Sequence, residues 1–305
     1  MLILSHVKQS VESLAFSPDG RFIAVGGTSG KVGLQIWSWA TQSRMSQKTS
    51  VPVAVYGLWW LADGRLLVGR AGLGVHIYQR DPADLWVITC FHNALLTGIT
   101  PTGHGWASYR PPLAHENHLF GIRLSAADVR HEEWSVPIGL TGRSKMAFAL
   151  AGGRFLSVEE EYADLQPKIR VYLRSTATGE VLEQLTYPYW VIGPGTVAPD
   201  GLSFWIAYHR SIIRWQVGNP THFADLIQND SRQHFTALAF SPDGRHLAAA
   251  GNDQAVKFYD AETGQLAKTF TWDIGRMRSI AFSPDGTMAA AGSDTGRVVV
   301  WDVDV

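Results

Sequence analysis

Two histidines flank an acidic residue at a spacing that could hold a metal ion. They occur in His115-Glu116-Asn117-His118, and a His-Glu-Glu group follows at residues 131–133. Imidazole and carboxylate groups are both ligands that zinc accepts. Histidines three positions apart share a face only on a helix, whereas this segment has the pattern of a turn between strands. A solvated loop explains the segment better, so we predict no metal site here.

Two other features could do chemistry. The acidic run at 159–164, with sequence EEEYAD, could bind calcium or a basic partner, but it lacks the alternating acids and glycine of a calcium loop. A solvated loop is again the preferred interpretation. Cys90, the only cysteine, is better explained as a small hydrophobic residue at a strand end than as a nucleophile.

The common catalytic signatures are missing from the sequence. It contains no Gly-rich phosphate loop, no dinucleotide-binding fingerprint and no Gly-x-Ser-x-Gly elbow. We therefore expect a protein that is not an enzyme and has no cofactor.

Composition narrows the class further. The chain has 305 residues, 46% of them hydrophobic, with 26 basic and 27 acidic residues and no basic stripe. We therefore expect a globular protein that does not bind nucleic acid. The apolar start, MLIL, is too short for a signal peptide, and no apolar run is long enough to cross a membrane. A single cysteine suits a reducing compartment, so we expect a cytoplasmic protein.

The elements that position these residues are revealed by a repeat. The hexapeptide AFSPDG occurs at 15–20, 239–244 and 281–286. Related Gly-containing turns end at Gly64, Gly103, Gly153 and Gly201, so seven turns follow one another at intervals of 39 to 50 residues. Spacing of this kind is typical of four-stranded propeller blades. Pro, Asp and Gly each favour a tight reversal, so the hexapeptide is predicted to be a hairpin corner with its preceding strand.

An aromatic residue follows each of these glycines after 14 to 19 positions. The seven are Trp37, Tyr78, Phe120, Tyr172, Trp215, Tyr259 and Trp301. Short apolar runs such as RFIAVGG and AVKFYD lie between turn signals and are predicted to be strands. We predict one domain over residues 1–305, an all-β, seven-bladed propeller of four-stranded antiparallel blades. The last repeat stops after its third strand, so residues 1–7 are predicted to supply the missing outer strand and close the ring.

On the segments LAFSPDGRHLAAAGNDQAVKFYD (238–260) and IAFSPDGTMAAAGSDTGRVVVWD (280–302), the chain resembles the WD-repeat β-propeller family. The Trp-Asp pair stands at Trp301-Asp302. Asp253 matches the family's turn aspartate, whereas the histidine that usually bonds it is missing. The resemblance implies a scaffold that binds proteins or peptides, usually without catalysis. The alternative is an enzyme or a small-molecule or metal binder that uses the central channel, but the apolar first strands favour the scaffold.

The candidate partner-binding residues lie in loops and blade connections expected on the narrower face. Aromatic residues in the connections could anchor a partner or plug the blade junctions, and the sequence leaves both open. Repeats one, three and four have longer loops, at 28–33, 111–117 and 161–167. We predict a patch on repeats three and four that binds a protein or peptide partner, with the chain itself a monomer. The candidates are His115, Glu116, Tyr162, Tyr187, Tyr189, Trp190 and Trp272.

Overall fold

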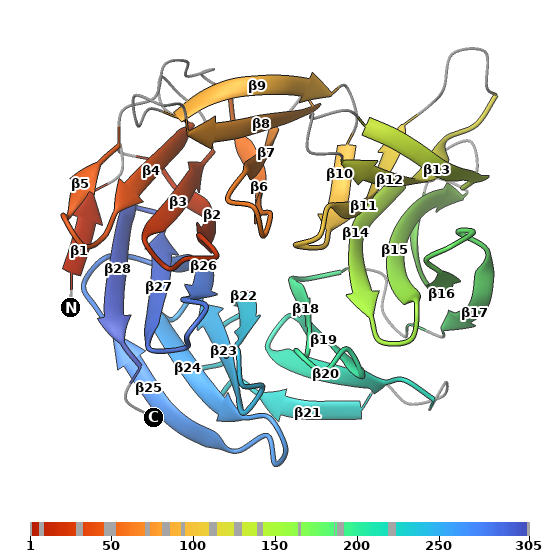
Figure 1. Cartoon of the computed structure of the whole chain (residues 1–305). Coiled ribbons are helices and arrows are strands. Elements are labelled where there is room, and N and C mark those ends of the chain that lie inside the picture. Colours follow the sequence, from red (N-terminus) through yellow and green to blue (C-terminus); the bar gives the residue numbers. More distant parts are fainter. Residues whose placement is uncertain are drawn as a thin grey trace.

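Seven small β-sheets surround a central axis in the computed structural model (Figure 1). Each sheet has four antiparallel strands, as the sequence predicts. The structure describes residues 2–5, 9–28, 33–45, 53–70, 74–80, 86–92, 95–109, 115–124, 130–138, 143–163, 166–185, 187, 192–218 and 224–303. Within these ranges no helix is long and apolar enough to span a membrane.

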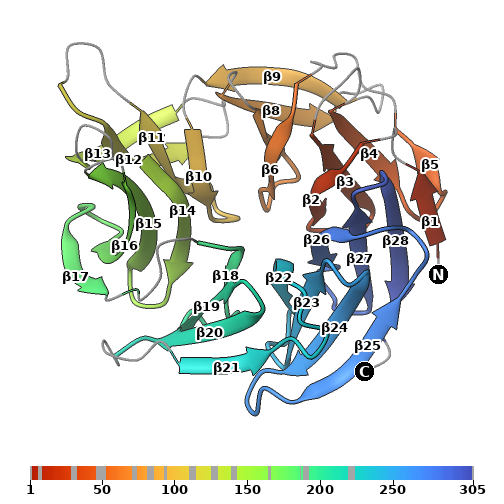
Figure 2. The ribbon, with the colours of Figure 1, turned by 180° about the vertical axis from the view of Figure 1, so that it is seen from behind.

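The blades are numbered along the chain, and the strands of each blade run from the axis outward (Figure 2). The innermost, first strands are β2 (Val11–Phe16), β6 (Val55–Trp60), β10 (Leu95–Ile99), β14 (Arg143–Leu150), β18 (Gly195–Val197), β22 (Phe235–Phe240) and β26 (Met277–Phe282). The second strands are β3 (Phe22–Gly27), β7 (Leu66–Arg70), β11 (His104–Tyr109), β15 (Arg154–Ala163), β19 (Ser203–Tyr208), β23 (His246–Gly251) and β27 (Met288–Ser293). The third strands are β4 (Leu34–Ser38), β8 (Gly74–Arg80), β12 (His118–Leu124), β16 (Gln166–Ser175), β20 (Ser211–Gln216), β24 (Ala255–Asp260) and β28 (Arg297–Asp302). The outermost, fourth strands are β5 (Ser43–Arg44), β9 (Trp86–His92), β13 (Arg130–Pro137), β17 (Val181–Leu185), β21 (Ala224–Gln228), β25 (Leu266–Thr271) and β1 (Leu2–Ser5).

The Ser-Pro-Asp-Gly turn is held by its own side chains. Gly20 has a φ of 69°, a conformation that glycine adopts without steric cost. The Asp19 carboxylate accepts hydrogen bonds from the Ser17 hydroxyl at 2.5 Å and from the Arg21 amide at 3.1 Å. The Ser17 hydroxyl also accepts the Phe22 amide at 2.9 Å. The predicted hairpin corner is confirmed, and the same contacts recur in the turns of blades 6 and 7.

The core lies between the blades. Seven apolar clusters of described residues each draw side chains from two neighbouring blades. Successive side chains of a strand point to opposite faces, so Ala248 packs toward blade 7 while Ala249 packs toward blade 5. A blade therefore depends on both neighbours to bury its two faces.

The N-terminal segment closes the ring as predicted. Strand β1 pairs antiparallel with β28 and completes the last blade, with Leu4 opposite Val298. Leu4 is buried in the cluster between blades 7 and 1. Residues 6–8 lie outside the described ranges, so the pairing is established for 2–5 of the predicted 1–7.

Hydroxyl groups of the first strands tie neighbouring blades together around the channel. The Thr236 hydroxyl donates to the Met277 carbonyl of the next blade at 2.7 Å. The Ser279 hydroxyl donates to the Val11 carbonyl at 2.9 Å, across the ring closure. These polar side chains of the first strands therefore serve the ring itself.

The strand order gives the ring two distinct faces. One face carries the turns between first and second strands, including the Asp-Gly turns, and we call it the Asp-Gly face. The other carries the turns between second and third strands together with the connections from blade to blade, and we call it the connection face. The connection face is the one on which the sequence places the predicted partner-binding residues.

Candidate functional site

Within the described residues, blade 4 carries the longest hairpin of the connection face. Strands β15 and β16 are ten residues each, whereas most first, second and third strands have six or fewer. Their pairing continues to Ala163 opposite Gln166, with Tyr162 opposite Pro167. The hairpin therefore extends beyond the ends of its neighbours. Residues 164–165 at its tip, and the Tyr162 side chain, lie outside what the structure describes.

The predicted residues of blade 3 precede β12. His115 is exposed and Glu116 is half-buried in a bend that leads into the strand. This bend lies on the connection face, in the blade next to the long hairpin. The structure places His115, Glu116 and the backbone of Tyr162 on adjacent blades of the connection face, while residues 110–114 of that loop lie outside the described ranges.

The aromatic residues of the inter-blade connections pack into the junctions. Tyr187 is half-buried against the apolar cluster between blades 4 and 5. Trp272 is half-buried with its ring centroid 4.5 Å from that of Trp301 and 5.9 Å from that of Phe270. The sequence left open whether these aromatic residues anchor a partner or fill the blade junctions. Their contacts are those of residues that fill the junctions. Tyr189 and Trp190 lie outside the described residues.

Residues 159–163 of the acidic run lie in strand β15 and not in a solvated loop, so that prediction is wrong for the described part of the run. Glu159 lies in β15 and is buried, with its carboxylate 2.8 Å from the guanidinium of Arg174. The Ser157 hydroxyl also donates to Glu159, at 2.7 Å. Glu160 pairs with Lys145 at 2.6 Å. The sequence pattern predicted a loop because charged residues are rarely buried in a sheet unless a partner neutralises them. Such partners are distant in the sequence and could not be identified from it.

The acidic and histidine residues of blade 3 also make polar contacts across strands. Glu133 contacts the Arg123 guanidinium at 3.1 Å and the His104 ring at 3.2 Å. His118 lies at the start of β12 with its Nδ1 atom 3.1 Å from the Ser135 hydroxyl. Among the described residues there is no group of three or more His, Cys, Asp or Glu side chains that could hold a metal ion. Cys90 lies within β9, whose side chains are outside the description.

A buried lysine organises the connection face of blade 6. The Lys257 ammonium donates to Asn229 at 2.6 Å, Asp230 at 2.5 Å and Asp253 at 2.9 Å. The Ser231 hydroxyl donates to Asp253 at 2.6 Å. Burial favours a higher pKa for Asp253, but the hydrogen bonds from Ser231 and Lys257 outweigh it and lower the pKa of that carboxyl. Ser231 and Lys257 thus supply the hydrogen bonds to Asp253. The sequence analysis identified the aspartate but not these two partners.

A second polar network lies inside blade 2. Arg70 is buried and its guanidinium donates to the Tyr78 hydroxyl at 2.7 Å. His76 is also buried, and burial together with the Arg70 charge lowers its pKa to about 4. Two basic groups in a core are compatible when one of them stays neutral. His76 is therefore an uncharged core histidine at neutral pH.

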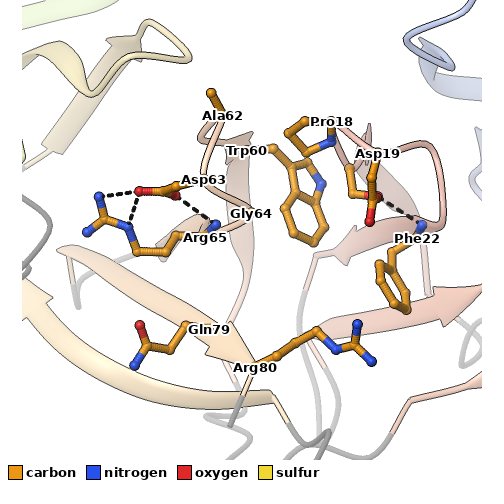
Figure 3. A pocket seen from close by; sticks show the side chains of 11 residues that line it. Pro18, Asp19, Phe22, Trp60, Ala62, Asp63, Gly64, Arg65, Gln79 and Arg80 are labelled. Carbon is orange, nitrogen blue, oxygen red and sulfur yellow. Dashed lines mark hydrogen bonds and ion pairs between the residues drawn. The ribbon is translucent and has the colours of Figure 1, made fainter. Parts of the chain in front are cut away.

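The Asp-Gly face has a pocket between blades 1 and 2 (Figure 3), with a volume of about 400 Å³. Trp60 lies between the turns that contain Asp19 and Asp63, and Gln79 and Arg80 lie below it. The Arg65 guanidinium is held by Asp63 at 2.8 Å. Burial favours a higher pKa for Asp63, but the hydrogen bonds from Arg65 lower it overall. The charged groups of the two turns therefore stabilise the turns themselves.

A larger groove opens at the junction of blades 3 and 4. It has a volume of about 750 Å³ and is lined by residues of β13, β15, β16 and β17, with Val181 and Leu182 on its exposed edge. The described apolar cluster of this junction has only four fully buried members. Blade 4, which carries the long hairpin, is thus joined to blade 3 by the smallest of the described clusters.

Comparisons with known proteins bear on three parts of the chain. A family model described as WD domain, G-beta repeat matches residues 2–34 and 264–302, and one described as anaphase-promoting complex subunit 4 WD40 domain matches residues 213–275. Among solved structures, the β-propeller domain of Cps50 (Swd1) from Myceliophteria thermophila is similar, with a TM-score of 0.73 and 17% identity. The match covers 98% of this chain and 99% of that one. The sequences of curated proteins give no significant match.

Proposed function

Because the chain belongs to the WD-repeat β-propeller family, we propose that it is a non-catalytic scaffold that binds a protein or peptide on its connection face. Propellers of this family typically serve as protein-interaction scaffolds. A rigid ring that presents turns and connections on one face suits this role, because binding residues on loops are held in place by the scaffold beneath them.

The long β15–β16 hairpin is the observation that carries the proposal. It extends a strand pair past the blade core while the Lys145 to Glu160 ion pair, at 2.6 Å, supports its stem. Next to it, blade 3 presents the exposed His115 and the half-buried Glu116. A strand pair that continues past the blade core offers a preformed backbone, which lowers the entropic cost of binding.

The partner is a protein or peptide, and the chain itself is a monomer in this proposal. The ring has no open blade edge at its closure because β1 covers β28, so self-association through that edge is not needed for folding. The single cysteine suits the reducing cytoplasm as the place where the partner is met.

Affinity capture from native lysate tests the proposal. The baits are the parent chain, a His115→Ala/Glu116→Ala/Tyr162→Ala variant, and a control with three substitutions on the Asp-Gly face, Leu202→Ala/Arg245→Ala/Glu262→Ala. Circular dichroism and thermal unfolding establish that all three are folded. We expect bound proteins, identified by mass spectrometry, that the parent and the control retain and the first variant loses.

Two results would contradict the proposal. Equal retention by all three baits would place the contact elsewhere on the ring. Failure of the folded parent to retain any protein, with a small molecule or metal released from it on denaturation, would favour the central channel instead.

A further inference from the structure

The connection face over blades 5 to 7 carries an excess of basic side chains. We call the residues 208–211, 229–234, 251–257, 272–278 and 293–297 the basic sector. It has four aspartates and more basic residues, which are the permanently charged Arg210, Arg232, Lys257, Arg276, Arg278 and Arg297. It also contains His209 and His234. The whole chain has a net charge of −1, so the positive charge of this sector is a local feature.

The parts of the basic sector form one continuous surface. The rings of His209 and His234 lie with their centroids 4.8 Å apart and join the turn of blade 5 to the connection before blade 6. The His234 carbonyl accepts the Asn252 amide at 3.0 Å. The Arg278 guanidinium donates to the Asn252 side chain at 3.1 Å. Three consecutive blades thus present these groups side by side.

Most carboxylates of the sector are already used inside it. Asp230 and Asp253 both bind the buried Lys257. Asp294 accepts the Arg276 amide at 3.0 Å and lies 4.0 Å from the Arg278 guanidinium. Asp273 is exposed and, within the described residues, has no ion-pair partner. Lys257 neutralises only one of its two aspartates, so that cluster and Asp273 leave two negative charges, which the remaining arginines of the sector outnumber.

The side chains of three arginines in the sector form no hydrogen bond or ion pair with any other described residue. Arg210, Arg232 and Arg276 are all exposed, and their guanidinium groups make no such contact within the described ranges. An arginine guanidinium offers five N–H donors in a planar fork that matches a carboxylate. These three side chains are therefore available to an anionic partner.

Two basic residues of the sector have positive φ angles, a backbone conformation that glycine adopts more easily than residues with large side chains. His209 has a φ of 54° and Arg232 a φ of 60°. His209 and Arg210 form the two-residue turn between β19 and β20, a position for which Asn-Gly is the preferred pair. The left-handed conformation is sterically unfavourable for a non-glycine residue. Non-glycine residues kept in such conformations are concentrated at functional sites.

We propose that the basic sector binds an acidic segment of the partner, rich in aspartate and glutamate. This inference rests on the proposed scaffold function and specifies the chemistry of the partner. Bidentate pairs between arginine and carboxylate fix the position of such a segment, and the positive field accelerates its association. Three available arginines are few beside the roughly 6–10 phosphate contacts of a strongly salt-dependent nucleic-acid complex.

Fluorescence anisotropy with the intact chain tests this proposal. The probe is a fluorescein-labelled peptide that alternates glutamate with alanine, compared with the same peptide carrying glutamine and with a single-stranded oligonucleotide of equal length. The sector variant is Arg210→Gln/Arg232→Gln/Arg276→Gln. The matched control, Arg21→Gln/Arg44→Gln/Arg245→Gln, removes three exposed arginines outside the sector and so changes the net charge equally.

We expect the glutamate peptide to bind, with affinity that falls as sodium chloride is raised, because salt screens exposed charges. The sector variant should bind about tenfold more weakly and the control variant within about twofold of the parent. Equal binding of the glutamine peptide, or an equal loss in both variants, would overturn the proposal. Tighter binding of the oligonucleotide would also overturn it and assign the sector to nucleic acid.

Lysate capture separates failure of this proposal from failure of the scaffold function. A partner that the parent captures and the sector variant also retains would refute the acidic segment while the scaffold function stands. A parent that captures no partner refutes the scaffold function whatever the peptide does.

Discussion

Leu4 offers a sharp test of ring closure by the N-terminal strand. Leu4 and Ile3 are neighbours on β1, but Leu4 is 3% exposed in the junction of blades 7 and 1 whereas Ile3 is 45% exposed. We expect Leu4→Ala to lower the free energy of unfolding by about 2–3 kcal/mol, from lost burial and the cavity left behind. Ile3→Ala, the matched control, should cost about 1 kcal/mol or less.

Urea unfolding followed by tryptophan fluorescence and by circular dichroism measures both variants. The two signals should share one midpoint for each variant, because every blade buries its faces against both neighbours and the closure joins the first blade to the last. Equal losses in the two variants would refute the assignment of Leu4 to the closing junction. A deletion of residues 1–5 with an unchanged midpoint would refute ring closure by β1 altogether.

Three further predictions concern buried charge. Lys257→Met should lower the free energy of unfolding in urea by about 3 kcal/mol because it leaves Asp253 unpaired, and adding Asp253→Leu should recover much of that loss; a neutral single variant would contradict this account. Arg174→Met should cost about 3 kcal/mol by isolating Glu159, and Glu159→Gln in the same chain should restore part of it; no restoration would refute the pairing. The pKa of His76 is lowered from 6.5 to about 4, so the unfolded chain binds more protons and stability should fall as the pH drops from about 6.5 toward 4. His76→Gln should flatten that part of the stability profile, and an unchanged slope would count against a neutral buried His76.

The fold could be predicted because its signals are local. A Pro-Asp-Gly turn depends on a few adjacent residues, and Gly20 adopts the positive φ that the pattern requires. Strand alternation has a period of two, so the aromatic column and the apolar runs identify three strands of each blade. The missing fourth strand of the last blade and the spare apolar segment at the start of the chain together predict the pairing of β1 with β28.

The candidate site could be predicted only in part. Loop length pointed to blades 3 and 4, where the structure has the longest hairpin. The same reasoning placed Glu159 in a solvated loop, although it is buried against Arg174. Sequence patterns also left the role of Trp272 open, and its packing against Trp301 became apparent only in the structure.

The sequence by itself determines the turns, because they depend on adjacent residues, and the number of blades, because it follows from a simple period. The same period shows that the last blade lacks a fourth strand, which predicts the closure of the ring. Only the tertiary structure decides which charges are neutralised. Arg174, for example, meets Glu159 across 15 positions of sequence. A carboxylate that finds such a partner becomes part of the core, whereas an arginine that finds none, such as Arg232, stays at the surface available to another molecule.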